Sequence, residues 1–123
     1  MLKKGRIEDV YKGRIPSGNL VYVVTPKAKS PLAPSKDLMN RWKKGMISKR
    51  EFMEEYLKEL KNRSTALSLI EKIAIVSAYK DVWLVTDNNG FDYIHILLEI
   101  VEKCLNQKDK PVKVIIDKMI EFL

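Results

Sequence analysis

The chain has 123 residues, of which 46% are hydrophobic. This is enough for a single packed domain over residues 1–123, and the hydrophobic content is too high for a disordered chain. No run approaches about 18 consecutive apolar residues, and no apolar stretch follows Met1, which excludes a membrane-spanning helix and a secretory signal. We therefore expect a soluble, cytoplasmic protein with no membrane partner.

The formal net charge of +7 is distributed unevenly along the chain. Residues 1–29 carry +5, residues 30–63 carry +4, and residues 64–123 carry −2. A basic half beside a mildly acidic half indicates an anionic partner such as a nucleic acid, a phosphate-containing ligand or the acidic face of a second copy. Because the lysines are interleaved with glutamates, an ordinary solvated surface fits the same pattern.

The first third of the chain contains one clear strand signal. Residues 4–8 give only a weak one, among charges and glycines. Leu20–Thr25 is a nearly continuous β-branched and aromatic run, typical of a strand that is covered on both faces. The prolines and serines of residues 27–34 then predict a loop.

Two helices with well-marked starts follow this loop. Ser35 is placed to cap a helix over Lys36–Lys44, which Gly45 would end. Ser48 and Glu51 form a capping-box pattern that predicts a second helix reaching about Lys61. A third helix is expected over Ala66–Ala78, and its apolar composition predicts that it is largely buried.

The second half of the chain predicts a buried strand over Val82–Thr86 and a helix over Phe91–Asn106. In the helix, apolar residues recur at spacings of three and four residues, a pattern that argues against a hairpin through Asn89 and Gly90. The β-branched run Val112–Ile116 predicts a further strand, followed by a terminal helical turn from Asp117 to Phe122. Strands separated by helical crossovers predict an α/β fold: a single small domain with a short, mainly parallel sheet and helices packed on it.

Three stretches of the chain resemble a known family, and the resemblance covers about residues 20–105. They are Leu-Ala-Pro-Ser-Lys-Asp-Leu at 32–38, Trp-Lys-Lys-Gly-Met-Ile-Ser at 42–48 and the helix stripe of residues 51–60. The chain thereby resembles the domain of unknown function 488 family, which has no established activity. The resemblance implies the fold and no active site, because Thr86 and Asp92-Tyr93-Ile94 stand where that family has a Cys and a Cys-His-Arg triplet.

The topology itself suggests one candidate site. Ligands of parallel sheets bind beyond the carboxyl ends of the strands, often at a helix N-terminus that favours anions. The segment from Thr86 to Gly90 is such a place, and the residues after Leu20–Thr25 are expected beside it. The candidate anion-binding residues are Thr86, Asn88, Asn89, Gly90, Lys27 and Lys29. Acidic Asp87 and Asp92 at the same helix start, and the ordinary turn character of Asn-Asn-Gly, argue for a simple cap instead.

A second hypothesis places a nucleic acid on the basic half, with phosphate contacts that depend on salt. The basic-surface candidates are Arg41, Lys43, Lys44, Lys49 and Arg50. Trp42 and Tyr22 would supply stacking faces, but Trp42 shares a helical face with Leu38, which favours inward packing. A homodimeric interaction scaffold is a third hypothesis.

Catalysis is the least favoured function class. His95 is the only histidine and has no Ser or Cys predicted beside it, so we interpret it as structural. Cys104 lies on the apolar face of its helix and is expected to be a packed core residue. No carboxylate spacing is typical of a metal site, and we expect no metal and no cofactor. The sequence thus favours a non-catalytic module that binds an anionic partner, with a small enzyme at the strand-end crevice as the alternative.

Overall fold

A parallel sheet of three short strands forms the base of the computed structural model, which describes the whole chain except residue 17 and residues 88–90. The strands are β1 (Leu2–Arg6), β2 (Leu20–Val23) and β3 (Val82–Thr86), in the spatial order β1–β3–β2. In the register of β2 and β3, Tyr22 lies opposite Leu84. This confirms that the two predicted strands are parallel neighbours and that the fold is a small α/β domain.

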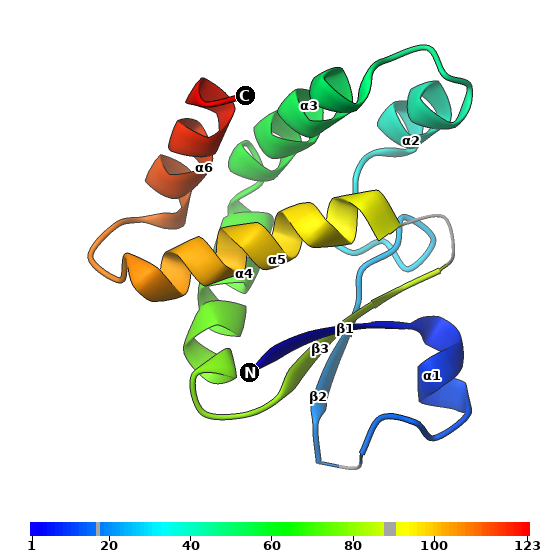
Figure 1. Ribbon diagram of the computed structural model, residues 1–123, viewed down its shortest axis with the longest axis vertical. Coiled ribbons are helices and arrows are strands. Elements are labelled where there is room, and N and C mark those ends of the chain that lie inside the picture. The colour runs from blue at the N-terminus through cyan, green and yellow to red at the C-terminus, as the bar shows by residue number, and fades with distance from the viewer. Residues whose placement is uncertain (17, 88–90) are drawn as a thin grey trace.

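The central and outer strands differ in burial. In β3, Val82 and Leu84 are fully buried in the core, as expected for a strand with a neighbour on each side. In β2, Leu20 and Tyr22 pack against the core, whereas Val23 is 40% exposed. The prediction that β2 is covered on both faces is therefore wrong, because most of the helices gather on one side of the sheet (Figure 1) and Val23, on the other face, is left exposed.

The weakly signalled first strand is β1, which begins two residues earlier than predicted and pairs with β3. Its ladder places Gly5 opposite Val85. A Cβ on Gly5 would lie 3.2 Å from the ring of Trp83, so glycine makes room for the indole. On the same ring, the Lys3 ammonium lies 5.4 Å from the centroid, a cation–π contact. Tertiary contacts with β3 therefore complete a strand that the local sequence signals only weakly.

Six helices accompany the sheet in the described part of the chain. Figure 1 shows α3 to α6 gathered on one side of the sheet, with α1 lying apart from them at the end of β1. Their bounds are α1 (Ile7–Tyr11), α2 (Lys36–Lys43), α3 (Lys49–Lys61), α4 (Ser64–Ser77), α5 (Phe91–Asn106) and α6 (Val112–Glu121).

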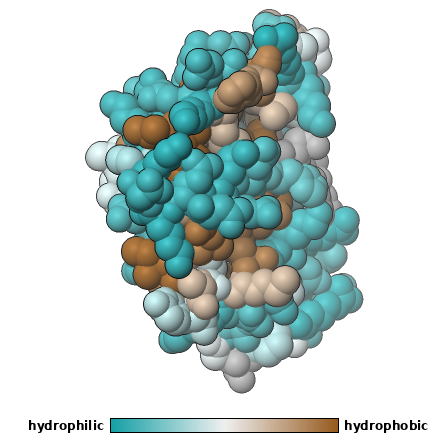
Figure 2. Space-filling model, turned by 60° about the vertical axis from the view of Figure 1, so that its left-hand side comes forward, coloured by the Kyte–Doolittle hydropathy of each residue, from teal (hydrophilic) through white to brown (hydrophobic). Residues whose placement is uncertain are grey.

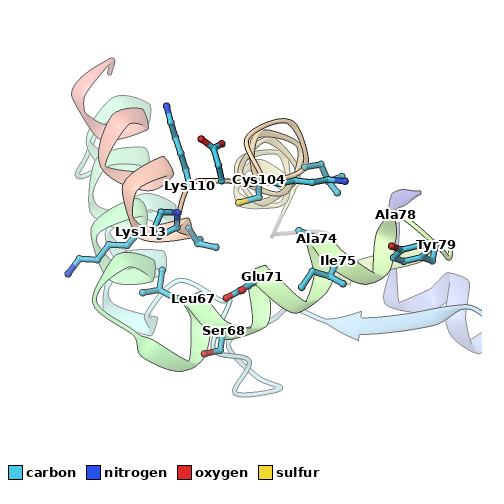
Figure 3. Close-up of a pocket in the computed structure, with 15 residues that line it drawn as sticks. Leu67, Ser68, Glu71, Ala74, Ile75, Ala78, Tyr79, Cys104, Lys110 and Lys113 are labelled. Atoms are coloured by element: carbon cyan, nitrogen blue, oxygen red, sulfur yellow. The ribbon is translucent and has the colours of Figure 1, made fainter.

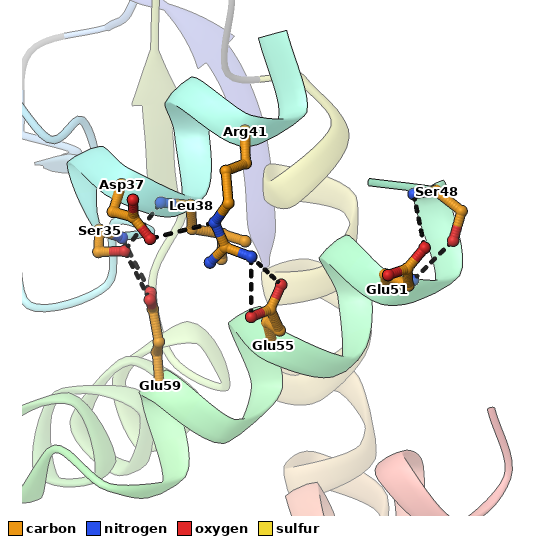
Figure 4. Close-up of polar contacts among 8 residues, drawn as sticks. All are labelled: Ser35, Asp37, Leu38, Arg41, Ser48, Glu51, Glu55 and Glu59. Atoms are coloured by element: carbon orange, nitrogen blue, oxygen red, sulfur yellow. Dashed lines mark hydrogen bonds and ion pairs between the residues drawn. The ribbon is translucent and has the colours of Figure 1, made fainter. Parts of the chain in front are cut away.

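Both predicted helix caps are present. The Ser35 hydroxyl accepts a hydrogen bond from the backbone N–H of Leu38, and α2 begins at the next residue. At α3, the Ser48 hydroxyl accepts from the N–H of Glu51, while the Glu51 carboxylate accepts from the N–H of Ser48 (Figure 4). This reciprocal pair confirms the capping box and fixes the start of α3.

Helix α4 is less buried than its composition predicts. Ile70 and Ile73 are fully buried, but Ile75 is 58% exposed and Leu67 and Leu69 are half-buried. Apolar residues on several faces of α4 therefore do not all reach the core, because α5, α6 and the sheet cover only part of its circumference.

The final predicted strand is a helix instead. Residues 112–116 open α6, in which Val112, Ile115 and Ile116 are buried against the rest of the core. These positions follow the i, i+3, i+4 spacing of a helix, and half-buried Met119 and Ile120 continue it. The β-branched composition of the segment was therefore a poorer guide than its spacing. Asp117, predicted to cap a turn, instead pairs with Lys61 of α3 at 2.5 Å.

Candidate functional site

A hollow of about 220 Å³ lies at the carboxyl ends of β2 and β3. Lys27, four residues after β2, and Asp87, which directly follows β3, both line it. The predicted proximity of these two loops is therefore confirmed. We call this cavity the strand-end hollow, and its lining residues are Pro26, Lys27, Lys36, Met39, Asn40, Lys43, Asp87 and Tyr93.

Helix α2 provides one wall of the strand-end hollow. Lys36, Asn40 and Lys43 follow one another at spacings of four and three, so they share a helical face that borders the cavity. The buried side chain of Leu38 anchors another face of α2 in the core. Sequence reasoning did not assign Lys36 and Asn40 to the site, although their spacing from Lys43 was a signal for a shared face.

The strand-end hollow is cationic. Three lysines and one aspartate line it, and the lysines come from two separate segments of the chain. Among the residues that the structure describes, Lys27, Lys36 and Lys43 form no ion pair and no side-chain hydrogen bond. Their ammonium groups therefore keep their full capacity to donate hydrogen bonds to an anion.

Thr86, the first predicted anion ligand, is fully buried and does not line the hollow. Its hydroxyl lies 2.9 Å from the hydroxyl of Tyr93, which in turn donates to the backbone carbonyl of Val24. Burial raises the pKa of Tyr93 to about 12. Thr86 therefore ties α5 to the sheet. The predicted ligands Asn88, Asn89 and Gly90 lie outside the described residues.

Lys29 belongs to a neighbouring cavity of about 380 Å³, which we call the loop hollow. A tight turn places it there. The Thr25 hydroxyl accepts from the N–H of Ala28, and the N–H of Lys29 donates to the carbonyl of Pro26. Pro26 and Lys36 line both cavities, so the two hollows adjoin. The remaining residues of the loop hollow are Ser30, Pro31, Ala33, Pro34, Ser35, Arg63 and Thr65.

The predicted basic-surface residues lie in different surroundings. Arg41 donates to Asp37 and makes two hydrogen bonds with Glu55 (Figure 4), and the bonds to Glu55 raise the pKa of its guanidinium. Lys43 lines the strand-end hollow, whereas Lys44 and Arg50 are exposed outside it. Lys49 lines a separate cavity with His95 and Glu99.

Trp42 packs inward, as its shared face with Leu38 predicts. Its ring centroid lies 5.1 Å from that of Phe52, and the side chain borders the hydrophobic core. This packing covers part of the indole, which is half-buried.

His95 and Cys104 lie apart from the strand-end hollow. His95 is exposed on α5, and its Nε2 atom lies 3.4 Å from the ammonium of Lys4. Cys104 is a buried core residue, as predicted, and burial raises the pKa of its thiol to about 11. Within the described ranges, no cluster of three His, Cys, Asp or Glu side chains is placed to hold a metal ion.

A further cavity, of about 640 Å³, was not predicted from the sequence. It lies between α4, the end of α5 and the start of α6, and exposed Ile75 and Tyr79 are among its lining residues together with Cys104. Brown apolar patches separated by hydrophilic ones appear on the face shown in Figure 2. In Figure 3 the side chains of Lys110 and Lys113 extend outward from the cavity, so their charges do not converge on a common point within it.

Over the described residues, every helix is too short or too polar to cross a bilayer.

Comparisons with known proteins add no identification. The chain matches no protein-family model, no curated protein and no solved structure. The resemblance to the domain of unknown function 488 family therefore stays a prediction.

Proposed function

We propose that this protein binds a small anionic ligand, of which a phosphate-bearing molecule is the best fit, in the strand-end hollow and without performing chemistry on it. The observation that carries the proposal is the gathering of Lys27, Lys36 and Lys43 around one cavity at the carboxyl ends of two parallel strands. Sites at this edge of a parallel sheet are the usual place for ligands in α/β proteins.

The size of the hollow favours a small anionic group. Its volume of about 220 Å³ is below the roughly 300–1,000 Å³ of cavities that enclose drug-sized ligands. A phosphate is compact, carries up to two negative charges and offers several acceptor oxygens to ammonium donors. Asn40 adds an amide that can donate or accept, which suits a ligand with a hydroxyl beside its phosphate.

The chemistry of the lining favours binding over catalysis. The hydroxyls of Thr86 and Tyr93 are already bonded to each other and to Val24, and the described residues of the lining include no serine, cysteine or histidine. The lysine side chains and Asn40 remain, and they suit recognition of a negatively charged group.

The test compares two neighbouring lysines by titration calorimetry at low salt, with inorganic phosphate and a sugar monophosphate as probes. Lys43→Ala is expected to weaken binding about tenfold, because it removes one charge-assisted hydrogen bond. Lys44→Ala is the matched control, since Lys44 carries the same charge at the next position and does not line the hollow. We expect its affinity to stay within about twofold of the unmodified protein, the difference that long-range charge alone produces.

Two results would contradict the proposal. If neither probe binds the unmodified protein, the anion site does not exist. If instead a single-stranded oligonucleotide binds with steep salt dependence, and both substitutions weaken it equally, the basic surface binds nucleic acid and the hollow is not the determinant.

A further inference from the structure

The loop hollow is the second cationic cavity of the same face. Three basic residues line it, Lys29, Lys36 and Arg63, together with the hydroxyl-bearing residues Ser30, Ser35 and Thr65. Its described lining contains no carboxylate, whereas Asp87 lines the strand-end hollow. The loop hollow is therefore cationic as well, with Lys29 and Lys36 as its lysines and with Arg63 paired to Glu59.

Some of these polar groups already have partners. Arg63 donates to the carbonyls of Pro31 and Ala33 and pairs with Glu59, and the Ser35 hydroxyl donates to Glu59. These bonds hold the loop against α3. Lys29 and Lys36, in contrast, make no ion pair or side-chain hydrogen bond with any residue that the structure describes, so their ammonium groups are available to a ligand.

The backbone of Lys29 gives a separate indication. Its φ of 55° is in the left-handed region, where a non-glycine residue costs roughly 1 kcal/mol. Asparagine and glycine tolerate this conformation better than lysine. A lysine at this position therefore lowers the stability of the folded state. It also contributes a residue with an ammonium group to the lining of the loop hollow.

The two hollows are close enough to serve one molecule. Lys36 and Pro26 line both, so a ligand that passes over Lys36 enters each cavity. An anionic group in the strand-end hollow would meet Lys27, Lys36 and Lys43, and a second group in the loop hollow would meet Lys29 and again Lys36.

We propose that the loop hollow is a second anion subsite and that the ligand carries two phosphate groups on separate arms, one for each hollow. This inference rests on the proposed function of the strand-end hollow. It adds the class of ligand, a bisphosphate, and it assigns Lys29 as the residue that distinguishes a bisphosphate from a monophosphate.

The test uses ligand pairs that differ by one phosphate. Fructose 6-phosphate is compared with fructose 1,6-bisphosphate, and adenosine 5′-monophosphate with adenosine 3′,5′-bisphosphate, by calorimetry at fixed low salt. In at least one pair the bisphosphate is expected to bind about tenfold more tightly, because the second contact forms within a ligand that is already held.

Two variants assign the subsites. Lys29→Asn is expected to reduce the preference for the bisphosphate to about twofold and to leave monophosphate affinity unchanged. Its melting temperature should equal or exceed that of the unmodified protein, since asparagine fits the left-handed backbone, so lost binding cannot come from lost stability. Lys43→Ala should weaken both members of a pair.

The possible failures are distinct. Equal affinity for mono- and bisphosphate in both pairs overturns the second subsite and leaves the proposed function standing. Equal weakening of both ligands by Lys29→Asn also overturns it, because Lys29 would then belong to a single site. Absence of binding by all four ligands overturns the proposed function as well.

Discussion

The hydroxyl of Tyr93 on α5 donates a hydrogen bond of 2.5 Å to the backbone carbonyl of Val24, one residue beyond β2. Because this bond uses the one proton of the phenol, the Thr86 hydroxyl at 2.9 Å is the donor toward Tyr93. All three groups are buried. This short chain of bonds joins α5 to both strands whose ends form the strand-end hollow.

Replacing Tyr93 with phenylalanine should destabilise the protein by about 1–3 kcal/mol, because the Val24 carbonyl and the Thr86 hydroxyl would be left buried without this partner. Urea denaturation measures the change. Thr86→Val should cost less, since the bond from Tyr93 to Val24 survives it. Additive effects in the double variant would contradict the proposed chain of bonds.

Alkaline pH should also weaken the fold through Tyr93. Burial raises its pKa from 10.0 to about 12, so folding favours the neutral phenol. The resulting stability is fully present below pH 10 and is lost as the pH rises toward 12. Circular dichroism in urea between pH 9 and pH 12 should show this loss, with a shallower slope in Tyr93→Phe. Burial also raises the pKa of Tyr56, so part of the loss should remain in that variant.

The two serine caps should differ in their contribution to stability. Ser48→Ala removes an exposed cap and should cost about 1 kcal/mol. Ser35→Ala should cost about 2 kcal/mol, because Ser35 both caps α2 and donates to Glu59 at 2.6 Å in a partly buried position. Chemical denaturation of the two variants checks the order, and equal losses would show that the bond to Glu59 adds nothing.

Cys104 should react slowly in the folded protein. Burial, with a smaller contribution from the charge of Glu71, raises the pKa of its thiol to about 11, so about one thiol in a thousand is ionised at pH 8. Labelling with a disulfide reagent at that pH should be at least about 100-fold slower in the native state than in urea. Rapid native labelling would mean that the thiol is accessible and ionised.

Local sequence signals predicted those elements whose caps and spacing agree. Ser48 and Glu51 mark the start of α3, and the buried run around Leu84 marks the central strand. The prediction of a strand over Val112–Ile116 was wrong. β-Branched residues are common in strands, but here packing against α3 and α5 favours a helix. The strand β1 was only weakly predicted because its pairing with β3 and the Trp83 ring over Gly5 are long-range contacts.

The candidate site was predictable in its location and less so in its members. The rule for parallel sheets predicted that Lys27 lies beside the end of β3. The structure agrees, because Lys27 and Asp87, the residue after β3, line the same hollow. Lys36 could be assigned only once the orientation of α2 over the sheet was known. Thr86 was predicted as a ligand, yet its side chain faces Tyr93, because the inward or outward direction of a strand's last residue depends on packing.

Two tyrosines hold the segment that carries Lys27 and Lys29. Tyr93 bonds to Val24 at its start, Tyr56 donates to the carbonyl of Leu32 at 2.6 Å near its end, and the two rings meet edge to face at 5.8 Å. A loop that is already ordered in the free protein loses less conformational entropy when a ligand binds. We therefore expect the ligand to bind a preorganised site, with fast association and little rearrangement of the backbone.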